Sequence, residues 1–106
     1  MDIEKILTEI KNQILELLNS KYKEFEPELK KDINRFLAES KEKLERWALL
    51  LINKSITKDE LEWLLKSQQE LVVLQTLQVA GISRIKINNL KNNILNIVFK
   101  TIIKAL

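Results

Sequence analysis

The side chains of this sequence that could do chemistry are carboxylates, and they come in two clusters. The clusters are Glu24, Glu26 and Glu28, and Asp59, Glu60 and Glu62. Carboxylates held a few ångströms apart in a cleft can act as acid and base or can bind a divalent metal. Both clusters, however, flank predicted helix ends, and negative charge stabilises a helix N-terminus. We therefore assign them structural roles and predict no catalytic residue.

The residue types that other kinds of site require are missing. The 106 residues include no cysteine and no histidine, so thiolate nucleophiles, the usual general base and the commonest metal ligands are excluded. The single glycine leaves no glycine-rich loop that could hold a phosphate. We expect a non-enzymatic protein with no metal, no cofactor and no small-molecule substrate.

The C-terminal third of the chain differs in charge from the rest. Residues 71–106 contain no acidic residue and five basic ones, which gives a charge of +5. Residues 1–70 contain 15 acidic and 13 basic residues, which gives −2. The basic residues are sparse and the aromatics few, so we do not expect nucleic acid as a partner.

Within this region, residues 83–105 are predicted to form a helix with an unusually wide apolar side. Its apolar side comprises Ile87, Leu90, Ile94, Leu95, Val98 and Ile102. The apolar arc covers about half of the helix circumference, more than the roughly 100° that one packing face needs. Three interpretations stay open: a core helix of the same chain, a seam with another copy or a helical partner, or a helix lying on an anionic membrane.

The two tryptophans, Trp47 and Trp63, stand on either side of a predicted turn at 53–57. One interpretation is an exposed pair that anchors a partner. The other places Trp47 in the core and lets Trp63 cover the corner between two helices, and we favour it. Trp63 stays a candidate interaction residue together with the six apolar residues of the last helix.

Local signals set the ends of the predicted helices. Thr57 followed by Glu60 forms a capping box, which marks a helix start. Pro27 is expected to end the first helix and to suit the first turn of the second. Gly81 is expected to end the third helix in a Schellman motif, and the alternative is one helix that continues through it.

The sequence therefore predicts a single all-α domain over residues 1–106. We expect a bundle of about four helices at 2–26, 28–53, 58–80 and 83–105, with antiparallel neighbours. The first two helices would be about 36 Å long, and as a hairpin extending beyond the rest they would need a second chain to cover them. We expect a cytoplasmic helical interaction protein that forms homo-oligomers or binds a helical partner. The alternative function is peripheral binding to a membrane by residues 83–106.

Overall fold

The computed structural model of the chain describes residues 2–67, 72 and 74–105. These residues form five α-helices and one short 3₁₀ helix, with no strand among them. The elements are α1 (Ile3–Lys21), η1 (Lys23–Phe25), α2 (Glu26–Ile52), α3 (Lys58–Ser67), α4 (Gln75–Val79) and α5 (Arg84–Ala105). The all-α bundle predicted from the sequence is confirmed.

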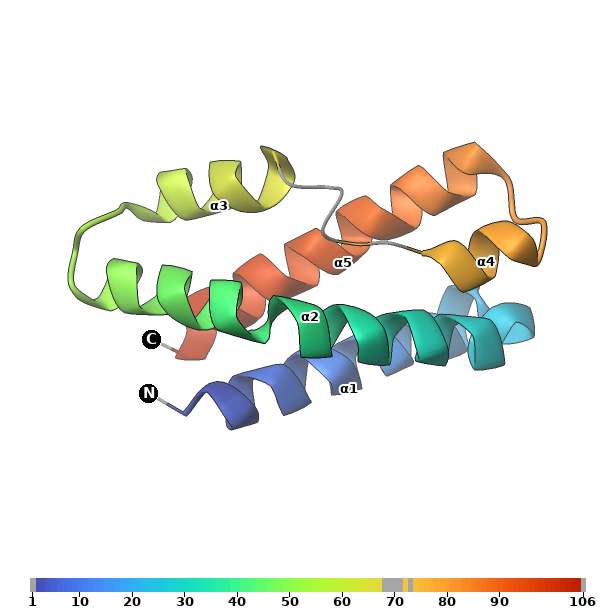
Figure 1. The fold of residues 1–106 in the computed structure, drawn as a ribbon, viewed down its shortest axis with the longest axis horizontal. Helices are drawn as coiled ribbons and strands as arrows, with labels where there is room; N and C mark the ends of the chain where they lie inside the picture. Colours follow the sequence, from blue (N-terminus) through green and yellow to red (C-terminus); the bar gives the residue numbers. More distant parts are fainter. Residues whose placement is uncertain (1, 68–71, 73, 106) are drawn as a thin grey trace.

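The helices pack around one core in a body of 42 × 24 × 22 Å. Helices α1 and α2 form an antiparallel hairpin, and α5 packs against α1 (Figure 1). Helix α3 packs on α5 and α2, and α4 packs on α2. The hairpin is thus covered along its length by the rest of the chain, and the expected overhang is not seen. The N- and C-termini lie at the same end of the molecule (Figure 1).

The first helix ends at Lys21, five residues before the predicted end at 26. Tyr22 leaves the helical conformation, with φ −129° and ψ 30°, and a 3₁₀ turn follows. Pro27 would in any case interrupt a helix that ran on from Lys21, because it has no N–H for the carbonyl of Lys23 and its ring would crowd that carbonyl. Pro27 lies instead in the first turn of α2, as predicted.

The third predicted helix, 58–80, is not one helix. Helix α3 ends at Ser67, Val72 forms a bend, Leu74 is irregular, and α4 begins at Gln75. Residues 68–71 and 73 of the predicted helix lie outside the described residues. Val72 and Leu74 are fully buried, so leaving the helix lets the chain direct both side chains into the core as it passes from α3 to α4.

The turn at Gly81 is confirmed as a Schellman motif. The N–H of Ile82 donates to the carbonyl of Leu77 (3.3 Å), and the N–H of Gly81 donates to that of Gln78 (3.1 Å). Gly81 has φ +90°, a conformation that favours glycine. Leu77 and Ile82, the two apolar positions of the motif, are both buried in the core.

The predicted start of the third helix is also confirmed. The Glu60 N–H donates to Thr57 Oγ1, and the Thr57 N–H donates to Glu60 Oε1, both over 3.1 Å. This reciprocal pair is the capping box expected from the sequence. At the start of α1, the Lys5 N–H donates to Asp2 Oδ1 (3.3 Å), so Asp2 caps that helix as expected.

Candidate interaction surfaces

The six apolar residues predicted on the C-terminal helix lie inside the chain's own core. Every one of Ile87, Leu90, Ile94, Leu95, Val98 and Ile102 is at most 4% exposed. They are buried because α5 packs against α1, α3 and α4. The helix therefore takes the first of its three interpretations, a member of the bundle. In this fold the six side chains are not accessible to a second protein or to lipid.

The rest of the wide apolar arc of α5 is also largely used within the chain. Ile97, Phe99 and Ile103 are partly buried against the core. Thr101 is buried as well, and its Oγ1 donates to the carbonyl of Ile97 (2.7 Å). The large apolar side chain of α5 that stays in water is Ile85, at the beginning of the helix, with 75% of its surface exposed.

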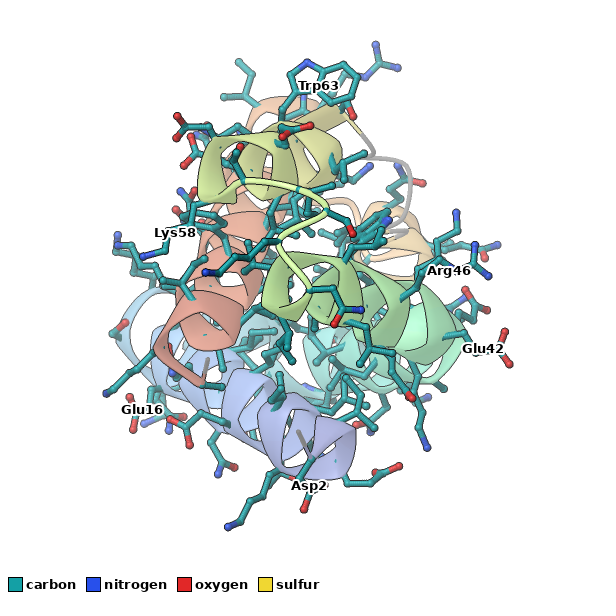
Figure 2. All side chains as sticks on the ribbon, turned by 90° about the vertical axis from the view of Figure 1, so that its left-hand side faces the viewer. Asp2, Glu16, Glu42, Arg46, Lys58 and Trp63 are labelled. Atoms are coloured by element: carbon teal, nitrogen blue, oxygen red, sulfur yellow. The ribbon has the colours of Figure 1, made fainter. Side chains whose placement is uncertain are left out.

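The two tryptophans have opposite environments. Trp47 is buried in the core at 7% exposure, as expected. Trp63 is 67% exposed and lies on the outer side of α3 (Figure 2), so it does not cover the corner between two helices. Its position follows from helix periodicity. Leu61 and Leu65 lie one turn apart and face the core, and Trp63, midway between them, points about 200° away from each.

The surface around Trp63 is a shallow depression along one side of α3. It is lined by Asp59, Glu62, Trp63, Lys66 and Ser67. Lys66 Nζ lies 3.0 Å from Glu62 Oε1 and pairs with it. An aromatic ring flanked by two carboxylates and one ammonium group can accept an apolar side chain with cationic neighbours, since the ring face also attracts cations.

Three further large apolar side chains are exposed elsewhere. Leu49 and Ile52 lie near the end of α2, and Val79 lies at the end of α4. Leu49 shares a hollow with Glu42 and Arg46, on a different side of the bundle from Trp63 (Figure 2).

Three of the six clustered carboxylates have structural partners. Glu26 pairs with Lys30 (2.9 Å), Glu60 belongs to the capping box, and Glu62 pairs with Lys66. In residues 2–67, 72 and 74–105, no group of three or more acidic side chains is placed to hold a metal ion.

One buried carboxylate with several hydrogen-bond donors, Asp32, was not predicted from the sequence. Asp32 is fully buried on α2. Its Oδ1 accepts from the N–H of Thr76 and its Oδ2 from the N–H of Leu77, both over 3.1 Å. Arg35 donates to the same carboxylate and to the Gln75 side chain. Asp32 thus caps α4 from another helix.

A surface ion pair joins the two helices of the hairpin. Lys41 of α2 donates to the carboxylate of Glu4 on α1. This hydrogen bond, followed by the negative charge of Glu4, raises the pKa of Lys41 above its ordinary value. The pair lies in water, so it contributes little to stability.

Comparison with protein families, curated proteins and solved structures found no match to this chain. None of the helices within the described residues is both long and apolar enough to cross a membrane.

Proposed function

We propose that this chain is a non-enzymatic helical protein that self-associates through apolar side chains on the surface of its bundle, with Trp63 as the main contact. The exposure of Trp63 is the observation that carries the proposal. Tryptophan is among the residues that contribute most to protein–protein binding when they become buried. Its placement on α3, opposite Leu61 and Leu65, means that the chain's own core does not use it.

In this proposal α5 contributes fewer contacts to self-association than its apolar sequence pattern suggests. Its predicted seam residues stabilise the monomer, and the side chain that it offers to a partner is Ile85. Binding to a membrane through residues 83–106 would require α5 to separate from α1, α3 and α4, which would expose the core. Self-association through the folded surface needs no such opening.

The proposal of a non-enzymatic role rests on residue types. Histidine and cysteine are absent from the sequence. Of the carboxylates named above, Asp32 and Glu60 cap helices, and Glu26 and Glu62 pair with neighbouring lysines.

Sedimentation equilibrium from about 10 µM to about 1 mM tests the proposal, a range suited to an interface smaller than the standard size. We expect the average mass to rise with concentration. Trp63→Ser should shift the association to at least ten-fold higher concentration. Leu49→Ser, which removes an exposed apolar side chain on another side of the bundle, should behave as the wild type. A wild-type chain that stays monomeric over this range would refute self-association.

A further inference from the structure

Two exposed apolar side chains of this protein lie among charged residues, and the net charge is negative around one and positive around the other. Trp63 on α3 lies among residues that carry two carboxylates and one ammonium group. Ile85, at the start of α5, stands between Arg84 and Lys86, and all three are exposed. An apolar contact and an electrostatic contact can therefore form together if the two sites meet.

Glu62 already pairs with Lys66 at an exposed position, but the other charges that would meet in such a contact have no partner of this kind in the described part of the chain. Among the described residues, Asp59 makes no ion pair, and neither the Arg84 nor the Lys86 side chain has an acidic partner. Residues 71–106 contain no acid at all, so the region that holds Arg84 and Lys86 cannot neutralise them itself. An acidic partner must come from elsewhere.

The two sites cannot meet within one copy as the chain is folded. Helix α3 and the beginning of α5 lie at opposite ends of the same side of the molecule, the upper side in Figure 1. Figure 2 has the same vertical axis and shows Trp63 at the top of the molecule. Helix α3, which carries Trp63, and the beginning of α5 therefore lie on the same side of the molecule, one toward each end.

This arrangement suits a dimer with two-fold symmetry. Consider a two-fold axis that lies in the surface of that side and runs across the long axis of the molecule at its middle. A second copy generated by this axis places its α5 start over the Trp63 of the first copy. The same rotation brings the Trp63 of the second copy under the α5 start of the first. A two-fold interface of this kind is closed, so it does not extend into a filament.

We propose that two copies of the chain dock reciprocally, the Trp63 side of α3 in each against the Arg84–Lys86 start of α5 in the other. The proposal rests on the self-association proposed above and names the surfaces that meet in it. Ile85 supplies the apolar contact to the indole ring. Arg84 and Lys86 face the carboxylates of Asp59 and Glu62, and a guanidinium or ammonium group over the indole adds a cation–π contact.

Charge reversal can test the pairing without unfolding the chain. Glu62→Lys changes an exposed pair on α3 that contributes little to stability. Arg84→Glu/Lys86→Glu places acids in the first turn of α5, where the helix dipole favours them. The second of these acids stands three residues after Ser83, whose Oγ already accepts from the Lys86 N–H (3.3 Å), so it completes a capping box. Both variants are therefore expected to fold.

Each variant alone should associate at least ten-fold more weakly than the wild type in sedimentation equilibrium, because like charges then face each other at both contacts. An equimolar mixture of the two should recover association to within about three-fold of the wild type. In the mixed dimer, the lysine at 62 of one copy meets the glutamates of the other, and the second contact is native. Lys100→Glu/Lys104→Glu makes the same net charge change at the far end of α5 and should leave association unchanged.

The outcomes separate this proposal from the one on which it rests. A monomeric wild type refutes both. A wild type that associates, with charge variants that associate equally well or a mixture that fails to recover, refutes the reciprocal docking and leaves self-association standing. Acrylamide quenching gives a second readout, since Trp47 is buried and the accessible fluorescence belongs to Trp63. Quenching should fall as the wild-type concentration rises, and in each variant measured alone the same fall should need at least ten-fold higher concentration.

Discussion

Replacing Asp32 tests whether the break between α3 and α4 is held in place by a carboxylate from α2. Asp32→Ala would remove the acceptor of two backbone N–H groups, those of Thr76 and Leu77. It would also remove the acidic partner of Arg35. The two N–H groups belong to the first turn of α4, where an isolated helix has no acceptors of its own.

The expected cost can be worked out from these contacts. Loss of a helix N-cap costs about 0.5–2 kcal/mol, and a buried donor left without a partner costs about 1–3 kcal/mol. The Leu77 N–H is buried and the Thr76 N–H is partly buried, so one full and one partial penalty apply. The Arg35 side chain is 36% exposed and can turn to water, so its loss adds little. The sum is about 2–4 kcal/mol of unfolding free energy.

Two variants separate the parts of this effect. Asp32→Asn keeps the shape of the side chain but offers one acceptor oxygen in place of two, and we expect about half of the alanine penalty. Arg35→Gln keeps both backbone hydrogen bonds and should cost less than about 1 kcal/mol. Glu39→Ala, on the exposed side of the same helix, should change stability by less than about 0.5 kcal/mol.

Urea unfolding followed by circular dichroism measures these differences, and hydrogen exchange of the Leu77 N–H locates them. We expect Asp32→Ala to lower the free energy of unfolding and to speed exchange at Leu77 by at least ten-fold. If Asp32→Ala matches Glu39→Ala in stability and Leu77 exchanges at the wild-type rate, the carboxylate does not hold α4.

Three further substitutions probe other parts of the bundle. Ser40→Ala should raise the free energy of unfolding in urea by about 1 kcal/mol. The buried Ser40 hydroxyl has no hydrogen-bond partner among the described residues, and alanine favours the helix. A loss of stability would show that the hydroxyl has a partner. Gly81→Ala should lower stability by about 1–2 kcal/mol through its positive φ alone, since an added Cβ would meet nothing within 4 Å; an unchanged midpoint would contradict that strain. Ile94→Glu should abolish cooperative unfolding because it buries an unpaired charge. Ile85→Glu changes a surface residue and should leave the monomer folded. A folded Ile94→Glu monomer would mean that this face of α5 does not belong to the core.

The features that sequence reasoning predicted correctly depend on residues close together in the chain. The capping box at Thr57 and Glu60 spans four residues, and the Schellman motif around Gly81 spans six. Each is complete within its own segment, so no tertiary information is needed to recognise it.

The start of α4 is capped instead by Asp32, which is 44 and 45 positions away from its two donors. Helical propensity in 68–80 cannot reveal a cap that another helix supplies. A signal was nevertheless present in α2. Asp32 stands three residues after Leu29 and four before Phe36, on the apolar side of that helix. A carboxylate at such a position must be buried, and a buried carboxylate needs donors.

The apolar sides of α5 and α3 show which surfaces helix periodicity can predict and which it cannot. For α5 the pattern identified the six buried apolar residues, but a face that packs within the chain and a face that packs on another copy have the same pattern. For α3 the same periodicity could have decided between the two interpretations of Trp63, of which we favoured the wrong one. Once the capping box sets the helix start, Leu61 and Leu65 share the inner side, and any rotation that buried Trp63 would expose both leucines. An apolar residue that periodicity places outside is therefore a stronger indication of a binding surface than a wide apolar arc, and Trp63 is such a residue.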